Sequence, residues 1–142
     1  EKLSYLKSKY VEKNEVKINI PSSLENLALI RALVKTYLEL HHIDTKEVFQ
    51  LLSVVDELAT NVVEHGYKYQ PGDIIIEISK SNDSIRLLVE DNGLGFDDTK
   101  ISKQDGGMGL FLARAIADDF KIEKKINGTI FKVEKKIREG NN

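Results

Sequence analysis

The sequence predicts an α+β fold: a two-layer sandwich with a mixed, largely antiparallel sheet and helices on one face. Three observations predict it. Short apolar segments alternate as in strands, two longer segments repeat apolar residues at helical spacing, and an Asn-Gly pair separates two further strand patterns. With 142 residues, of which 41% are hydrophobic and 31% charged, the chain has the size and composition of one globular domain.

The first half of the chain predicts one strand and two helices. Residues 16–20 alternate as in a strand, a first helix is expected from residue 22 to about residue 41, and a longer one runs to about residue 64. The residues expected at the boundaries are Pro21 at the strand end, Ser22 with Glu25 as a capping box, Asp44 or Thr45 as the second N-cap, and Gly66 as a C-cap.

The second half predicts four strands and one helix. The Asn127-Gly128 pair is the strongest short hairpin signal in the chain. The expected elements are a strand at 74–78, a turn at 81–84, a strand at 85–90, a polar loop at 97–104, a helix at 109–118, and strands at 121–126 and 129–133. We expect a domain at 15–138, with residues 1–14 as an extension or linker and 139–142 as a tail.

Composition excludes several classes of function. A net charge of -2 and a pI near 6.0 give no general attraction to nucleic acid or to an anionic membrane. The absence of cysteine excludes disulfides and thiolate metal sites, and no apolar run approaches the ~20 residues of a membrane helix. We expect a cytoplasmic protein, either a trimmed chain or one domain of a longer protein, since no starting methionine is present.

The second predicted helix carries a carboxylate and an amide one turn apart. At about 100° per residue, Glu57 and Asn61 share a narrow polar stripe, with apolar residues roughly opposite. One interpretation is a solvated helix face. The other is a nucleotide cleft, in which the Asn61 amide oxygen binds Mg²⁺ and Glu57 orients an incoming hydroxyl and accepts its proton.

Two glycine-rich segments follow that helix. Asp91 directly follows the apolar segment 87–89, where a partly buried carboxylate needs a hydrogen-bond donor such as an adenine amine. Gly93 and Gly95 would let a purine lie flat against the backbone, although an Asp-Asn-Gly turn explains the segment equally well. The cluster 106–109 leads into a helical pattern, so its amides and the helix dipole can hold phosphate.

In their order and spacing, the three segments resemble the Bergerat-fold (GHKL) ATPases, over about residues 15 to 137. On this resemblance, Glu57 and Asn61 match the N box and Thr129 matches a threonine near the adenine. The residues implied to bind ATP are Asn61, which is also the Mg²⁺ ligand, Asp91, Gly93, Gly95, Gly107, Met108, Gly109, Leu110 and Thr129. The loop between the glycine boxes would be an ATP lid, in which Lys100 and Lys103 either reach phosphate or are simply solvated.

Within this superfamily, residues 57–67 and the Gly-Met-Gly-Leu segment are especially similar to the anti-sigma factor serine kinases of the RsbW and SpoIIAB type. The resemblance implies a homodimer that sequesters a sigma factor or similar target. It also implies phosphorylation of a serine on a STAS-domain antagonist, with Glu57 as the base. Arg31 is a candidate docking residue for that antagonist, or else an ordinary exposed arginine. The alternative function is a non-catalytic, ATP-gated protein-binding module or the regulatory output domain of a larger signalling protein.

Overall fold

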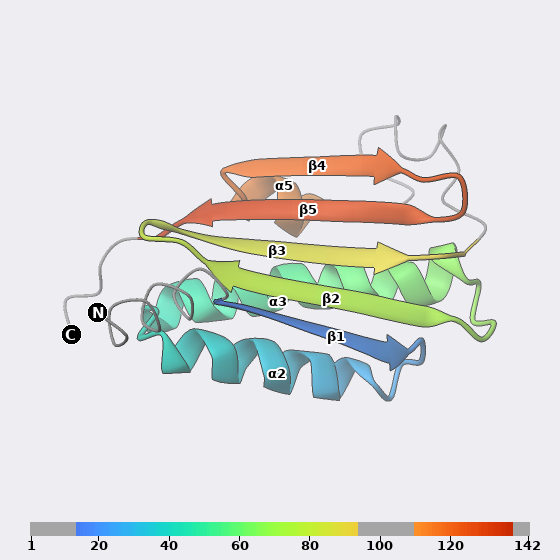
Figure 1. Ribbon diagram of the computed structural model, residues 1–142, viewed down its shortest axis with the longest axis horizontal. Coiled ribbons are helices and arrows are strands. Elements are labelled where there is room, and N and C mark those ends of the chain that lie inside the picture. Colours follow the sequence, from blue (N-terminus) through green and yellow to red (C-terminus); the bar gives the residue numbers. More distant parts are fainter. Residues whose placement is uncertain (1–13, 94–109, 138–142) are drawn as a thin grey trace, which may run out of the picture.

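The computed structural model describes residues 14–93 and 110–137 and confirms the α+β fold. Five strands form one sheet in the order β1-β2-β3-β5-β4, and all neighbouring pairs are antiparallel. The described helices lie on one face of this sheet (Figure 1). The elements are β1 (Glu15–Pro21), α2 (Leu27–Leu40), α3 (Thr45–Asn61), the π-helical turn η1 (Val62–Gly66), β2 (Asp73–Lys80), β3 (Ser84–Asp91), α5 (Phe111–Ile116), β4 (Asp119–Lys124) and β5 (Thr129–Lys136).

The hydrophobic core lies between the sheet and its helices. Successive side chains of a strand point to opposite faces, so the alternating isoleucines of β2 all face the helices. Register places Ile76 beside Val89 and Val89 beside Phe131, and all three side chains are fully buried. Burial of each such side chain stabilises the fold by roughly 1.5–3 kcal/mol. The other face of the sheet is polar and has no described helix over it (Figure 1).

The capping box predicted at Ser22 and Glu25 does not form. The backbone N–H of Ser22 donates to the carbonyl of Gly72 at 2.7 Å, which extends the β1–β2 pairing and holds Ser22 beside the sheet. A turn follows, and α2 begins at Leu27, five residues later than expected, with Asn26 at its N-cap position. The predicted helix start at Ser22 is wrong because the hydrogen bonding between β1 and β2 continues one residue past Pro21.

Helix α3 begins as predicted and ends differently. The Asp44 side chain accepts a hydrogen bond from the Lys46 N–H at 3.2 Å, which confirms the N-cap. The expected C-cap at Gly66 is wrong, because Gly66 is the last residue of the π-helical turn η1, which continues directly from α3. The left-handed residues that turn the chain toward β2 are Lys68 and Tyr69, with φ of 52° and 64°. The Gly66 carbonyl oxygen instead lies close to Gly93, as described below.

The C-terminal elements match their predictions with shifted boundaries. Helix α5 spans 111–116 rather than 109–118, and β4 and β5 begin or end a few residues from the expected positions. Gly128, at φ 116°, occupies the predicted hairpin turn between them. The expected lid at 97–104, residues 1–13 and the tail lie outside the described residues. None of the described helices is long and apolar enough to cross a membrane.

Candidate functional site

The end of α3 presents Asn61 and Glu57 together. Asn61 is buried, with 6% of its surface exposed, and its Nδ2 donates to the Glu57 carbonyl oxygen one turn earlier at 2.8 Å. This hydrogen bond orients the amide and uses one of its two N–H groups, and Oδ1 is the Asn61 atom that can bind a cation. An amide oxygen is a hard ligand of the kind that Mg²⁺ takes in proteins. The chemistry of this donor therefore fits the expected metal.

The Glu57 side chain contacts α5, which lies 55 residues further along the chain. Its Oε1 accepts a hydrogen bond from the Ala113 N–H at 2.9 Å, and its Oε2 accepts one from the Leu112 N–H at 3.1 Å. These N–H groups belong to the first turn of α5, where they have no partner within the helix and where a negative charge is favoured. Glu57 thus joins α3 to the helix that follows the second glycine cluster. Sequence analysis did not anticipate this contact.

Asp91 and Thr129 lie side by side in the sheet. They are direct partners in the β3–β5 register, both are fully buried, and both face the helices. Asp91 Oδ1 accepts from the Gly93 N–H at 2.9 Å. Asp91 Oδ2 and Thr129 Oγ1 are buried without a hydrogen-bond partner among the described residues. Unpartnered buried oxygens are uncommon in folded proteins, and this pair can hold a ligand that has a hydrogen-bond donor and an acceptor.

Burial also shifts the pKa of Asp91. Removal from water raises the pKa of the Asp91 carboxyl, while the Gly93 N–H and the positive charge of Lys125 oppose the shift. Lys125 reaches this region from the end of β4, where its Nζ donates to Glu90 Oε2 and to Asn92 Oδ1 at 2.6 Å. Sequence analysis missed Lys125, because only the β4–β5 hairpin brings it beside β3.

Two glycines are required by close backbone approach. A Cβ on Gly93 would lie 2.4 Å from the Gly66 carbonyl oxygen, and one on Gly128 would lie 1.9 Å from the Asp91 carbonyl oxygen. Both distances are shorter than any real contact of a Cβ atom. The chain therefore needs glycine at these positions to bring the ends of η1, β3 and β5 together, whether or not a purine also lies against Gly93.

The remaining predicted site residues divide into two groups. Leu110 is fully buried and immediately precedes α5. Arg31 lies on α2, exposed, where its guanidinium pairs with Asp56 at 2.6 Å. The others fall outside the described residues: Gly95, Gly107, Met108, Gly109 and the lid lysines Lys100 and Lys103.

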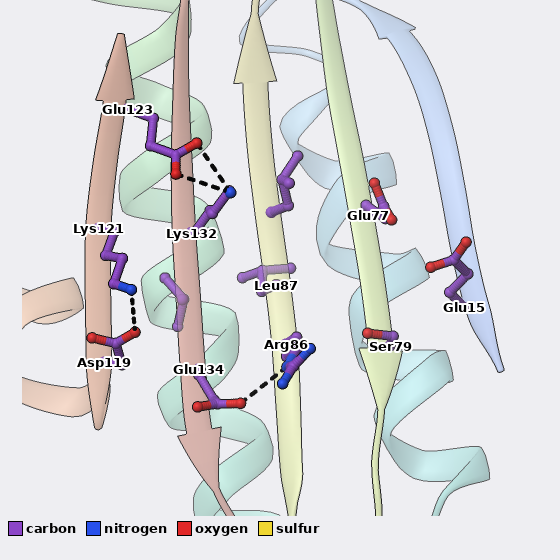
Figure 2. A pocket seen from close by; sticks show the side chains of 12 residues that line it. Glu15, Glu77, Ser79, Arg86, Leu87, Asp119, Lys121, Glu123, Lys132 and Glu134 are labelled. Carbon is purple, nitrogen blue, oxygen red and sulfur yellow. Dashed lines mark hydrogen bonds and ion pairs between the residues drawn. The ribbon is translucent and has the colours of Figure 1, made fainter. Parts of the chain in front are cut away.

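A broad depression of about 530 Å³ lies elsewhere, on the open face of the sheet (Figure 2). Its charged side chains come from all five strands and include the ion pairs Arg86–Glu134 and Lys132–Glu123, each at 3.0 Å. Figure 2 shows these side chains in front of the sheet with the helices behind it. None of the predicted site residues that the structure describes lines this depression, and Asp91 and Thr129 face the helical side of the sheet.

Comparison with known proteins decides the family. Residues 20–135 match the family of the histidine kinase-like ATPase domain. The chain belongs to this family. The match confirms the resemblance to the GHKL ATPases, and membership in a family of ATPase domains implies that the chain binds ATP.

Relatives of this histidine kinase-like ATPase domain include serine-protein kinases. The serine-protein kinases RsbW of Bacillus cereus (strain ZK / E33L) and Bacillus thuringiensis subsp. konkukian (strain 97-27) are each 25% identical to the chain over 122 residues. That alignment covers 76% of this chain and 76% of each relative. The relation is therefore distant but covers most of both proteins.

Solved structures share the fold. A structure of the RsbU and RsbW domains of Rv1364c from Mycobacterium tuberculosis aligns with a TM-score of 0.68 and 19% identity. It covers 87% of this chain, which spans about a third (32%) of that one. A chain of the SiaB–SiaC complex from Pseudomonas aeruginosa aligns with a TM-score of 0.62 and 14% identity, covering 95% of this chain and 98% of that one. At these identities the likeness concerns the fold.

Proposed function

We propose that the chain is an ATP-dependent protein serine kinase that acts as an anti-sigma factor in a bacterial partner switch. The observation that carries the proposal is the position of Glu57, a carboxylate one helical turn from the buried Asn61 amide. A module that only binds nucleotide needs a phosphate and metal site but no base. The distant RsbW relatives, named as serine-protein kinases, support the same assignment.

The adenine end of ATP is assigned to Asp91 and Thr129. The exocyclic adenine amine can donate to Asp91 Oδ2, and the Thr129 hydroxyl can donate to a ring nitrogen, so both unpartnered oxygens gain hydrogen bonds. The ionised carboxyl is the better acceptor, because a proton on Oδ2 would turn that oxygen into a donor facing the amine. Asn61 Oδ1 would hold Mg²⁺, which neutralises phosphate charge when bound.

Glu57 is assigned as the residue that receives the serine proton. Each carboxylate oxygen has two lone pairs, and the Leu112 and Ala113 N–H groups use one on each oxygen. A lone pair on each therefore remains for a substrate hydroxyl. The two hydrogen bonds also hold the carboxylate in one orientation, which favours in-line transfer by positioning.

The proposed protein partners follow from the resemblance to the anti-sigma factor serine kinases. The antagonist that receives phosphate would be a STAS-domain protein, and the sequestered target a sigma factor or another regulated protein bound by a homodimer. Arg31 is the proposed docking residue for the antagonist. In this structure it pairs with Asp56 on α3, directly before Glu57 in the sequence, so a partner that binds Arg31 would compete with that ion pair.

One observation favours the alternative, a non-catalytic ATP-gated binding module. Both oxygens of Glu57 are engaged by the α5 backbone, which is a structural role that a protein without phosphotransfer would also retain. In that case nucleotide binding would select partners without consuming ATP. The two functions differ in whether Glu57 is needed for chemistry or only for holding α5.

The test is phosphate transfer from Mg-ATP labelled at the γ-phosphate to proteins of a cell extract from the source organism. Three proteins are compared: wild type, Glu57→Gln, and Glu123→Gln as a control carboxylate on the open face of the sheet. We expect a small protein to be labelled on serine by the wild type and the control but not by Glu57→Gln. ATP binding without label from any of the three would favour the binding module.

A further inference from the structure

Tyr67, the residue after η1, connects three segments through its hydroxyl. The hydroxyl donates to the Asp73 carbonyl at 2.7 Å and accepts from the N–H groups of Asp73 at 3.2 Å and Asn92 at 2.8 Å. A phenol has one proton and two lone pairs, so every hydrogen-bonding position of this group is used. The end of η1, the start of β2 and the end of β3 are thereby held at one point.

The Tyr67 ring explains Gly72 and adds to the close contacts at Gly93. A Cβ on Gly72 would lie 2.1 Å from Tyr67 Cε1, and one on Gly93 would lie 3.0 Å from Tyr67 Cδ1. Both glycines therefore leave room for the ring against the backbone on either side. The ring position is therefore specified by packing as well as by the hydrogen bonds of its hydroxyl.

The anchored residue Asn92 lies between the two groups that shape the adenine end. Asp91 precedes it, and Gly93, which follows it, donates its N–H to Asp91 Oδ1. Holding the Asn92 N–H in place also holds the backbone that carries the Asp91 side chain and the Gly93 N–H. Tyr67 also continues directly from α3 and η1, so the same side chain sets the separation between Asn61 and Asp91.

We propose that Tyr67 is a positioning residue for nucleotide binding, which aligns the adenine end of the site with the end of α3. This inference rests on the proposed function, because it assigns Asp91 to adenine. Tyr67 does not touch the phosphates or the substrate serine in this scheme. Its hydroxyl acts only through the backbone of Asn92, so its removal affects nucleotide affinity and leaves the chemical step intact.

The experiment compares Tyr67→Phe with Tyr37→Phe in the 142-residue chain. Tyr37 is a matched control, because its hydroxyl also donates to a backbone carbonyl, that of Asn14 at 2.9 Å, but at the start of β1 rather than beside Asp91. The dissociation constant for ADP is measured by titration calorimetry. We expect it to rise up to about tenfold in Tyr67→Phe, the upper end of the effect that follows from net loss of about one well-placed hydrogen bond. In Tyr37→Phe it should stay at the wild-type value.

Two further readouts separate positioning from general destabilisation. Amide hydrogen exchange without nucleotide should become faster at Asn92 and Asp73 in Tyr67→Phe and not in Tyr37→Phe. Phosphotransfer should show a raised KM for ATP with kcat unchanged at saturation. Equal ADP affinity in wild type and Tyr67→Phe would overturn the inference alone, whereas a wild type that binds no ADP would overturn the proposed function as well. Parallel losses in the two tyrosine variants would show a structural role only.

Discussion

Replacement of Glu57 tests the structural and chemical roles of this side chain together. Glu57→Ala removes the acceptor for two N–H groups in the first turn of α5. A hydrogen bond to a charged group is worth about 1.5–3 kcal/mol when the partner is left buried, and loss of an N-terminal cap costs about 0.5–2 kcal/mol. Leu112 is 42% exposed, so water can satisfy its N–H in the variant. We therefore expect a decrease of about 1–2 kcal/mol in the free energy of unfolding.

Glu57→Gln separates the two roles. Its Oε1 can still accept from one of the two N–H groups, so the expected loss of stability is about half that of Glu57→Ala. The neutral amide cannot accept the serine proton, so phosphotransfer should be lost while ADP binding persists. For this reason Glu57→Gln, rather than Glu57→Ala, is the informative variant for activity.

The assay is urea unfolding of wild type and both variants, with the slope against urea checked to be constant. Asp56→Ala is the matched control, since Asp56 is the preceding carboxylate on α3 and its ion pair with Arg31 is nearly half exposed. An exposed pair contributes at most about 1 kcal/mol, and often nothing measurable. If Glu57→Ala were as stable as wild type, the contact with α5 would carry no stability and our reasoning would be refuted.

Three other predictions follow from the site. The ratio of the ADP affinity of wild type to that of Asp91→Asn should fall as the pH is lowered, because protonation of the wild-type carboxyl removes an acceptor. The raised pKa of Asp91 places this fall at a higher pH than for an ordinary aspartate. A ratio that stays constant down to the pH range of an ordinary aspartate would contradict the prediction. Gly128→Ala combines a strained φ with a clash against the Asp91 carbonyl, so urea unfolding should show a loss on the order of 1–3 kcal/mol or more, against a small effect of Asn127→Ala. Arg31→Ala should slow phosphorylation of the antagonist while ADP affinity, measured by calorimetry, stays at the wild-type value; a large loss of ADP binding would exclude a docking role.

The sequence by itself determined the elements whose signals are local. Alternating isoleucines in β2, the Asp44 cap and the Asn127-Gly128 turn each depend on a few neighbouring residues, and each forms as predicted. The candidate residues at the ends of these elements were identified in the same way, helped by the resemblance to the ATPase superfamily. Local signals succeed here because the backbone geometry that satisfies them is set by residues close in the chain.

Tertiary structure decided the contacts between distant segments. Ser22 fails as a cap because a sheet hydrogen bond to Gly72 holds it, and the Glu57 carboxylate meets α5 only after both helices pack on the sheet.

Asp91 and Thr129 become neighbours because β5 pairs with β3. The Tyr67 hydroxyl accepts a hydrogen bond from the Asn92 N–H, which lies 25 residues further along the chain. Such contacts depend on strand order and register, which are fixed by the total burial of the sheet rather than by any short pattern. The sequence thus predicted the chemical groups of the candidate site, and the packing of the whole sheet determined how the described ones meet.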